Sequence, residues 1–346
     1  MKKLSVAIVG ATGVVGQQAI NALLGHPQFE IVSLAASEKS AGKKYSDAIA
    51  RGGVLGWHAD GEMPAGIGGM AVSDASSLDP RDVDLVLSCI ESDAARTLEP
   101  KFAEHCGVVS TASAFRRESD VPLVIPQVNP DDVGLIDSQR EQRGWDGFIT
   151  PIPNCTTTGL AITLKPLSGA FGLRSVVMTS MQAVSGAGRS PGVAALDITD
   201  NVIPFIAGEE EKVEAETRKI LGLPSLAVSC TCTRVPVLEG HTETVFASFE
   251  KTPSPQEAAA AMSGFLPKYR TRSTPSRLIR VFEDASRPQP RLDRNEGNGL
   301  TTSVGRIRAD PVLGLKYVLL SHNTKMGAAA GAVWLAELLE LKGYLK

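Results

Sequence analysis

The sequence predicts an α/β protein of two domains: a doubly wound parallel sheet, followed by an α+β domain with a mainly antiparallel sheet. In the first 150 residues, apolar runs typical of buried strands alternate with helical segments. Beyond residue 153, strand-like runs follow one another with fewer helices between them. The chain has 346 residues, and 43% of them are apolar. A chain of this length usually folds around more than one hydrophobic core.

The first domain opens with a βαβ pattern. Residues 4–9 form an apolar, β-branched run that is typical of a strand buried on both faces of a parallel sheet. Residues 17–24 place apolar side chains on one face of a helix, and residues 29–35 form the next strand. Strands at 83–90 and 107–111 and a helix at 94–105 repeat the alternation, which indicates a Rossmann-like nucleotide domain.

The second domain is predicted from its longer strand-like runs. Strands are expected at residues 175–184, 226–237, 244–250, 278–282, 301–307 and 317–320, with helices at 209–221 and 256–265. Residues 287–298 are expected to form an ordered loop. An alanine-rich helix at 325–341, opened by a capping segment at 321–324, should pack back on the first domain. We therefore expect one domain of residues 1–154 with 323–346, and another of 155–322.

Composition argues against several classes of partner. The 35 basic and 38 acidic residues give a net charge of −3, so nucleic acid is not an expected partner. The apolar run at residues 4–9 is too short to span a membrane and lacks the features of a signal peptide, which predicts a cytoplasmic protein without membrane contacts. Five irregularly spaced cysteines form no disulfide framework. No metal site is expected.

A glycine-rich loop follows the first predicted strand. Gly10, Gly13 and Gly16 lie between that strand and a helix, where backbone N–H groups and the positive helix end can hold a pyrophosphate. Thr12 occupies the position of the middle glycine of the usual fingerprint. A glycine-rich turn can be merely structural, but its place in the first βαβ unit favours nucleotide binding.

The end of the second predicted strand favours NADP(H) over NAD. Ser37, Lys39 and Ser40 can donate hydrogen bonds to a 2′-phosphate. NAD sites usually place an acidic residue here for the ribose hydroxyl, and Glu38 comes slightly late for that role. The alternative is that these are solvated loop residues.

Cys155 is the candidate nucleophile. It follows two prolines and Asn154, which can cap a helix that begins at the cysteine. A thiol in the first turn of a helix has a lowered pKa, which enlarges its thiolate fraction. A lone cysteine is more often a small buried apolar residue, but this position favours a reactive one.

His241 and Arg234 are the candidate partners of the cysteine. His241 follows a glycine at a turn between two predicted strands, where its imidazole can face a cleft and move protons. Arg234 lies near the end of the incoming strand and can bind a carboxylate through its planar guanidinium. Either residue alone would more often be a structural hydrogen-bonding group.

With these segments together, the sequence resembles the aspartate-semialdehyde dehydrogenases, especially their archaeal and fungal branch. The likeness covers almost the whole chain. It rests on residues 10–16 (Gly-Ala-Thr-Gly-Val-Val-Gly), 153–158 (Pro-Asn-Cys-Thr-Thr-Thr), 185–188, 200–205, 209–212, 232–242, 287–294 and 321–323. It implies a homodimer or homotetramer built through the sheet of the second domain.

The resemblance implies a role for each matched residue. Cys155 would be the nucleophile, His241 the general acid/base and Gln182 a group that orients the substrate. The substrate and phosphate pocket would contain Arg234, Arg116, Asn154, Glu209 and Lys212, with Arg117 as a rival for phosphate. Cofactor contacts would come from Gly10, Thr12, Gly13, Val14, Ser37, Lys39, Ser40, Ser185, Gly186 and Asn323. Lys39 departs from the arginine common in relatives, and Ser190 lengthens a loop at 188–192.

The implied reaction is a phosphorylating aldehyde oxidation. A thiolate attacks the aldehyde, hydride passes to NADP as a thioester forms, and phosphate cleaves the thioester. In reverse, L-aspartyl 4-phosphate is reduced to L-aspartate 4-semialdehyde for lysine, threonine and methionine biosynthesis. His241 would protonate the oxyanion, with backbone N–H groups near Cys155 as further stabilisers.

Three other functions stay open. Malonyl-CoA or another acyl-CoA could replace aspartyl phosphate on the same fold. N-acetyl-glutamyl-phosphate reductase is less favoured, because its nucleophile usually follows Pro-Gly, whereas Asn154 precedes Cys155 here. A redox-sensing NADP-binding protein without turnover would not need the carboxylate-binding Arg234.

Overall fold

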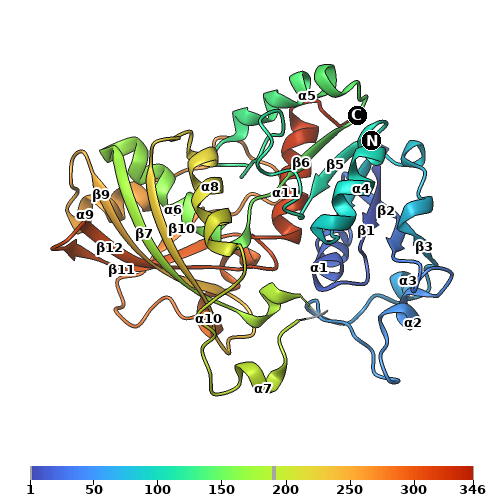
Figure 1. The fold of residues 1–346 in the computed structure, drawn as a ribbon, viewed down its shortest axis with the longest axis horizontal. Helices are drawn as coiled ribbons and strands as arrows, with labels where there is room; N and C mark the ends of the chain where they lie inside the picture. The colour runs from blue at the N-terminus through green and yellow to red at the C-terminus, as the bar shows by residue number, and fades with distance from the viewer. Residues whose placement is uncertain (1, 189–191, 346) are drawn as a thin grey trace. The chain divides into compact units, whose positions relative to one another are not determined.

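The computed structural model describes residues 2–188 and 192–345 and divides the chain into two compact units. Unit 1 contains Met1–Val124, Asp131–Ile152 and Ala332–Lys346, and unit 2 contains Ile125–Pro130 and Pro153–Gly331. Each unit is built on one six-stranded sheet (Figure 1). Ser190, expected to lengthen a loop, lies outside the described residues.

The sheet of unit 1 is entirely parallel and has the order β3-β2-β1-β4-β5-β6. Its strands are β1 (Leu4–Val9), β2 (Phe29–Ala36), β3 (Val72–Asp74), β4 (Leu85–Ser88), β5 (Gly107–Ser110) and β6 (Phe148–Pro151). Val6 to Val9 are fully buried, as expected for a strand covered on both faces. The strand order reverses between β1 and β4, which places the glycine-rich loop at the switch point where such sheets bind ligands.

The helices of unit 1 follow the predicted alternation. They are α1 (Val14–Leu23), α2 (Tyr45–Ile49), α3 (Ala65–Gly68), α4 (Ser92–Ala103), α5 (Leu135–Arg143) and α11 (Ala329–Leu341). α11 begins four residues later than predicted, because residues 325–328 form turns in which Ala329 donates to the carbonyl of Thr324. Its residues from Ala332 onward belong to unit 1.

A buried histidine anchors α11 to unit 1. Nδ1 of His26 accepts hydrogen bonds from the N–H groups of Gln28 (3.3 Å) and Phe29 (3.2 Å). Its Nε2 lies 2.8 Å from Oε1 of Glu337 on α11. Both side chains are almost fully buried, so the ring links the start of β2 to the terminal helix away from water.

Replacing this histidine should destabilise unit 1. His26→Ala removes three buried hydrogen bonds, and we expect a loss of about 2–4 kcal/mol in the free energy of unfolding. Urea unfolding followed by circular dichroism measures it. Gln28→Ala is the matched control, since Gln28 binds Glu340 of α11 in a less buried setting. Equal losses in the two variants would show that burial of the His26 contacts adds nothing.

The sheet of unit 2 has the order β10-β11-β12-β9-β7-β8. Its strands are β7 (Leu173–Gln182), β8 (Ala227–Arg234), β9 (His241–Phe249), β10 (Ile279–Val281), β11 (Thr302–Asp310) and β12 (Gly314–Ser321). The three inner pairs are antiparallel and the two edge pairs are parallel. The predicted, mainly antiparallel sheet is therefore confirmed.

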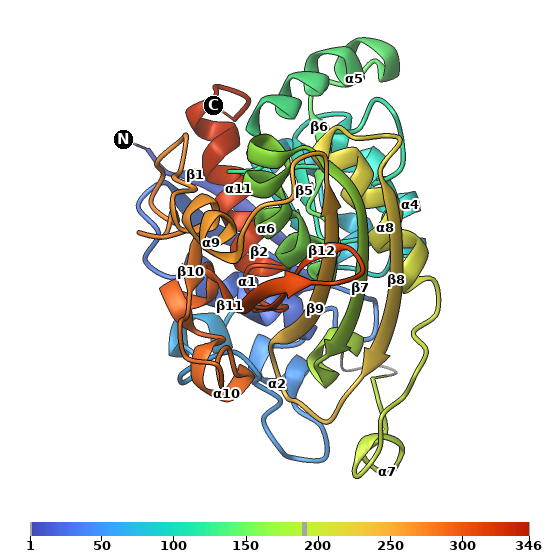
Figure 2. The same cartoon turned by 90° about the vertical axis from the view of Figure 1, so that its left-hand side faces the viewer.

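The helices of unit 2 are α6 (Cys155–Phe171), α7 (Ala195–Ile198), α8 (Glu209–Leu221), α9 (Pro255–Ser263) and α10 (Pro290–Asp293). Of these, α6, α8 and α9 contact strands of the sheet. α6 contacts β7, β9 and β12 and lies between α8 and α9. In Figure 2 the strands face the viewer and α6 lies behind them. On the opposite face, side chains such as Val177, Thr179 and Phe246 remain exposed or half-buried.

The prediction of an ordered loop at residues 287–298 is wrong in part. The segment is ordered, but it contains α10 and a short 3₁₀ turn at Glu296–Gly299. Pro290 is the first residue of α10, a position where its missing N–H is tolerated. The guanidinium of Arg287 binds the carboxylate of Asp293, with Nε 2.7 Å from Oδ2. This contact links a residue shortly before α10 to the last residue of that helix.

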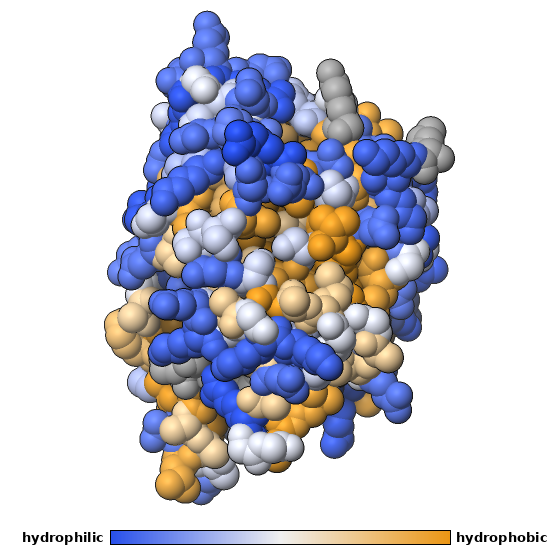
Figure 3. Space-filling view, turned by 90° about the vertical axis from the view of Figure 1, so that its right-hand side faces the viewer, coloured by the Kyte–Doolittle hydropathy of each residue, from blue (hydrophilic) through white to orange (hydrophobic). Residues whose placement is uncertain are grey.

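The described surface is mixed in polarity. Figure 3 shows one face of the molecule, where apolar side chains in the middle are bordered by hydrophilic ones. Large apolar side chains exposed in unit 1 include Val32, Val54 and Leu55. Among residues 2–188 and 192–345, none of the helices has the length and apolar character needed to cross a membrane.

Candidate active site

Cys155 is the first residue of α6. Oδ1 of Asn154 accepts hydrogen bonds from the N–H groups of Thr156 (2.8 Å) and Thr157 (3.3 Å), so the predicted cap is confirmed. The cysteine is half-buried and therefore accessible to a small substrate. Its sulfur lies at the positive end of a 17-residue helix, where an anion is stabilised.

His241 lies beside the sulfur. It is the first residue of β9, it is fully buried, and its Nε2 is 3.2 Å from Sγ of Cys155. Its Nδ1 accepts a hydrogen bond from the N–H of Ala183 at 3.1 Å. Because Nδ1 is an acceptor, the proton of the neutral ring is on Nε2 and points at the sulfur.

The surroundings keep this ring neutral. Burial, with the charges of Arg234 and His322, lowers the pKa of His241 to about 3. The imidazole is therefore uncharged at neutral pH, and a second proton on Nδ1 would face the N–H of Ala183. In this arrangement His241 is a hydrogen-bond donor to sulfur or to an oxyanion rather than a base toward the thiol.

Four side chains form one row across the sheet beneath the start of α6. Strand register pairs Gln182 of β7 with Arg234 of β8, and Ser321 of β12 with His241 of β9. Met181 pairs with Thr242, so Gln182 is the next residue opposite His241. We call Arg234, Gln182, His241 and Ser321 the catalytic row.

Arg234 is held at one end of this row. It is buried, and its Nη1 donates to the carbonyl of Ala183 at 2.9 Å. A Cβ on Gly186 would lie 2.8 Å from this Nη1 and 3.1 Å from Cε1 of His241, so a side chain there would press on both residues. Burial lowers the pKa of Arg234 from its usual value, although a guanidinium remains a cation. The structure thus brings a fixed positive charge close to the cysteine.

Glu209 connects several predicted substrate residues. It is the first residue of α8, and its Oε1 accepts hydrogen bonds from Nδ2 of Asn154 (2.8 Å) and Nε2 of Gln182 (3.2 Å). Its Oε2 lies 3.7 Å from Nζ of Lys212, which is one third exposed. The carboxylate thereby orients the amide of Gln182 and leaves the lysine at the surface.

Asn323 and Ser185 lie close to His241, next to the residue that precedes it. Nδ2 of Asn323 donates to Oγ of Ser185 at 2.8 Å, and its Oδ1 accepts from the N–H of Gly240 at 2.8 Å. Gly240 directly precedes His241, so these side chains and Gly186 border the catalytic row. The sequence placed all three among the cofactor contacts.

The backbone N–H groups of the three residues after Cys155 have partners of their own. The N–H groups of Thr156 and Thr157 are already bound to the side chain of Asn154, and that of Thr158 is bound to its carbonyl. The first turn of α6 therefore offers its dipole, while these three N–H groups are occupied. Nε2 of His241 is the donor that points at the sulfur.

Gly327 is a site residue that sequence reasoning missed. A Cβ at this position would lie 2.5 Å from Cβ and 2.7 Å from Cα of Cys155, and 2.9 Å from the carbonyl oxygen of Asn323. The segment before α11 therefore passes directly against the nucleophile. A glycine shortly before an alanine-rich helix gives no sequence signal for such a contact.

Gly327→Ala should displace the nucleophile. The new methyl group meets backbone atoms that cannot rotate away, and we expect kcat to fall at least about 100-fold, the effect of a misplacement near 1 Å. Steady-state kinetics of folded protein measures the effect. Gly169→Ala on α6 is the control, because a Cβ there meets nothing within 4 Å and alanine favours the helix. A Gly327→Ala enzyme with unchanged kcat would contradict the contact.

In unit 1, the glycine-rich loop has the shape of a phosphate cradle. Gly10 has φ = +84°, and a Cβ on it would lie 2.4 Å from the carbonyl oxygen of Cys89. A Cβ on Gly16 would lie 2.3 Å from the carbonyl oxygen of Gly10. α1 begins after Gly13 with no side-chain cap and no acidic residue in its first turn. This uncapped helix start fits a pyrophosphate.

The other predicted cofactor and phosphate residues also lie in unit 1. Ser37, Lys39 and Ser40 follow β2, the neighbour of β1, and are exposed or half-buried. Arg116 follows β5, is buried, and donates from Nη2 to the carbonyl of Thr111 at 2.8 Å, whereas Arg117 is exposed. The catalytic row belongs to unit 2, so the predicted site residues are divided between the two units.

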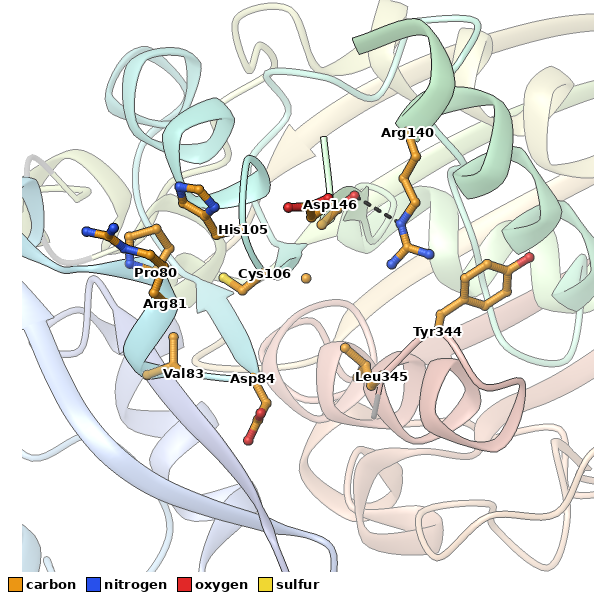
Figure 4. A pocket seen from close by; sticks show the side chains of 12 residues that line it. Pro80, Arg81, Val83, Asp84, His105, Cys106, Arg140, Asp146, Tyr344 and Leu345 are labelled. Atoms are coloured by element: carbon orange, nitrogen blue, oxygen red, sulfur yellow. Dashed lines mark hydrogen bonds between the residues drawn. The ribbon is translucent and has the colours of Figure 1, made fainter. Parts of the chain in front are cut away.

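A separate cavity of about 380 Å³ lies at the opposite end of the parallel sheet (Figure 4). Its lining comes from the amino ends of β4, β5 and β6, where His105 and Asp146 lie, and from Arg140 of α5 and Tyr344 after α11. Nε of Arg140 donates to the carbonyl of Gly147 at 3.2 Å. Doubly wound sheets bind nucleotides at the carboxyl ends of their strands, so this cavity is distinct from the glycine-rich loop.

The remaining cysteines differ from Cys155. Cys106 and Cys232 are buried, and burial raises the pKa of each to about 12. Burial also raises the pKa of Cys89 to about 12. Such thiols are protonated and unreactive at neutral pH. Within the part of the chain that the structure describes, no three His, Cys, Asp or Glu side chains gather as a metal site.

Two family models match most of the chain. A family model described as semialdehyde dehydrogenase, NAD binding domain, matches residues 5–136, and one described as semialdehyde dehydrogenase, dimerisation domain, matches residues 164–326. The aspartate-semialdehyde dehydrogenase of Archaeoglobus fulgidus is 49% identical over 97% of this chain and 98% of its own length. That of Saccharomyces cerevisiae is 41% identical over 98% of each chain.

Solved structures show the same fold. The aspartate-semialdehyde dehydrogenase of Candida albicans, solved with NADP, has a TM-score of 0.87 and 38% identity, over 99% of this chain and all of that one. Aspartate-semialdehyde dehydrogenase II of Vibrio cholerae, solved with ASA, has a TM-score of 0.81 and 28% identity over the whole of both chains. With such identity over nearly its full length, the chain belongs to the aspartate-semialdehyde dehydrogenase family.

Proposed function

We propose that Cys155 carries out the family's aspartate-semialdehyde dehydrogenase activity as a covalent nucleophile, assisted by the catalytic row. The observation that carries this proposal is the 3.2 Å contact between Sγ of Cys155 and Nε2 of His241, at the start of α6. Membership of the family establishes the activity itself. The role of each residue is what we add.

In the oxidative direction, the thiolate of Cys155 adds to the aldehyde carbon and gives a thiohemiacetal. Loss of hydride from that carbon leaves a thioester, and attack by phosphate releases L-aspartyl 4-phosphate and restores the thiolate. The biosynthetic direction reverses these steps. Arg234 and Gln182 hold the substrate, with the guanidinium binding its carboxylate. Asn154, Glu209 and Lys212 shape the pocket beside them.

His241 acts in both directions through its Nε2–H. This N–H donates a hydrogen bond first to the sulfur and then to the oxygen that becomes negative in the tetrahedral adduct, and the ring keeps its proton throughout. The N–H of Ala183 holds the ring in the required tautomer. Arg116 binds the incoming phosphate, with Arg117 as the alternative.

NADP(H) is the proposed cofactor, and when bound it accepts or supplies the hydride. The tight cradle of Gly10 to Gly16 and the uncapped start of α1 support binding of its pyrophosphate by Gly10, Thr12, Gly13 and Val14. Ser37, Lys39 and Ser40 would bind the 2′-phosphate, and Ser185, Gly186 and Asn323 would position the nicotinamide. The Candida albicans relative was solved with NADP.

We also propose a homodimer or homotetramer that works in the cytoplasm. The match to a dimerisation domain covers the sheet of unit 2. The face of that sheet opposite α6 keeps apolar side chains exposed, including Val177 at 43%, which suits burial against a second copy. On this proposal, residues 1–154 with 323–346 bind NADP(H), and residues 155–322 carry catalysis and assembly.

The reaction can be tested with two substrates. Purified protein with NADP, phosphate and L-aspartate 4-semialdehyde should form NADPH, and omission of phosphate should reduce the rate at least about 100-fold, because the thioester then lacks its acceptor. NAD in place of NADP tests the cofactor. Oxidation of NADPH by malonyl-CoA, without phosphate-dependent turnover of the semialdehyde, would refute this proposal and indicate an acyl-CoA reductase.

A further inference from the structure

Glu243 is a buried carboxyl group to which the mechanism gives no part. It lies two residues after His241 on β9, and alternation along the strand points both side chains at α6. Its side chain is fully buried. Neither carboxyl oxygen has a hydrogen-bond partner within residues 2–188 and 192–345. Buried polar groups without partners are rare, so this one calls for a physical explanation.

Glu243 lies in a second row directly behind the catalytic row. Strand register places Ser180 of β7 and Leu319 of β12 on either side of it, and Cys232 of β8 beyond Ser180. Oγ of Ser180 accepts a hydrogen bond from Nε2 of Gln182 at 3.2 Å. The second row therefore touches the catalytic row through this serine.

Helix α6 covers both rows in the same order. Cys155 lies over His241, and Gly159, one helical turn later, lies over Glu243. A Cβ on Gly159 would be 3.4 Å from Oε1 of Glu243 and 2.8 Å from Cβ of Ser321. Two residues of a strand and four of a helix both advance about 6 Å, so the carboxyl group lies about that far behind the imidazole.

Among the residues that the structure describes, no cation offsets the burial of this carboxyl group. The titratable groups that interact with it are Cys230 and Cys232 from β8 and Tyr317 from β12. His241 on its own strand is neutral at physiological pH, and Cys155 on α6 is a potential anion. Burial therefore raises the pKa of Glu243 well above its usual range. Arg234 belongs to the catalytic row, and β7 separates its strand from β9.

We propose that Glu243 is a neutral carboxylic acid in the active enzyme, and that its ionisation at alkaline pH inactivates the enzyme. In the neutral form, Glu243 places no charge behind His241, and its strand neighbour Ser180 accepts the hydrogen bond from Gln182. In the ionised form, a carboxylate one row behind His241 opposes a thiolate on Cys155 through a medium of low dielectric constant. This second part rests on the proposed role of Cys155.

The ionisation state can be tested without any activity measurement. Glu243 keeps its proton in the folded protein but loses it in the unfolded chain above pH 4.5, so its contribution to stability falls as pH rises toward the folded pKa. Glu243→Gln removes this titration. As pH rises from 5 to 8, we expect the Tm of Glu243→Gln to increase steadily relative to the Tm of the wild type. Parallel Tm curves would overturn the proposal.

The catalytic consequence is tested by the pH dependence of kcat and of iodoacetamide inactivation at Cys155. The wild type should lose activity in a one-proton step at alkaline pH, and this step should be absent in Glu243→Gln. Glu99→Gln is the matched control, because Glu99 is a buried carboxyl group in unit 1 with a raised pKa and should leave the step in place. An alkaline step that persists in Glu243→Gln contradicts the proposal.

An infrared measurement covers the case in which Glu243→Gln does not fold. In the Glu99→Gln background, a C=O band from a protonated carboxylic acid should remain at neutral pH and vanish at the pH where kcat falls. A missing band at neutral pH would refute the neutral form. If Cys155 were not the nucleophile, the Tm and infrared results would still hold while the inactivation result failed, so the two errors can be told apart.

Discussion

Cys155→Ala should lower kcat at least about 1000-fold while the protein remains folded, since removing a nucleophile abolishes the covalent route. The side chain is half-buried, so its truncation leaves no large internal cavity. Steady-state NADPH formation measures the effect, and circular dichroism confirms the fold. Cys155→Ser gives an informative second value, because a hydroxyl group is a far weaker nucleophile than a thiolate at neutral pH.

Cys106→Ala serves as the control for this series. Cys106 is a buried thiol in unit 1, and burial raises its pKa to about 12. Its loss should reduce stability by no more than about 1–2 kcal/mol and leave turnover in place. In the wild type, iodoacetamide should label Cys155 in preference to the other cysteines, as peptide mass spectrometry can show. Full turnover by folded Cys155→Ala would contradict the assignment of Cys155 as the nucleophile.

His241→Asn should reduce kcat about 10³-fold, whereas His241→Gln should lose only about 10- to 100-fold, because the two amides mimic different ring nitrogens. The amide of glutamine reaches the place of Nε2 and can still donate toward the sulfur and the oxyanion. The amide of asparagine reaches the place of Nδ1, where it meets only the N–H of Ala183. Steady-state kinetics of both variants separates a donor from a base.

Two measurements could contradict this role for His241. Equal losses in the glutamine and asparagine variants would indicate proton abstraction by the imidazole. An acid limb in the kcat profile near pH 6.5 that disappears in His241→Gln would also contradict a ring whose pKa is lowered to about 3. The same lowered pKa predicts that the free energy of unfolding falls as pH is lowered from 6.5 to 3, since only the unfolded chain protonates this histidine in that range.

Local sequence was sufficient for most of the secondary structure. The β-branched run at Leu4–Val9 and the amphipathic helix at Glu209–Leu221 both appear with the predicted bounds. Each carries a periodicity that its own residues determine. The predictions were less accurate at residues 287–298 and at the start of α11. In both places, contacts with residues outside the segment or across it decide the local conformation.

The candidate site shows the same division. Asn154 caps α6 because it directly precedes the helix, and this could be read from the chain. The roles of Ala183 and Gly327 could not be predicted from the sequence. Ala183 acts through a backbone N–H, and Gly327 through the side chain it lacks, so neither leaves a distinctive residue type in the sequence. Glu243 carries a signal in its residue type, but a glutamate in a strand does not reveal that nothing pairs with it.

The sequence by itself determined the first βαβ unit, most strands of the second sheet, the glycine-rich turn and the position of a cysteine at a helix start, since each depends on neighbours along the chain. The tertiary structure decided which side chains meet that cysteine. Arg234, Gln182 and His241 come from three strands, and only strand register aligns them in one row beneath α6. Burial beneath α6 then lowers the pKa of His241 and raises that of Glu243 in the row behind it, because charge is costly wherever water is excluded.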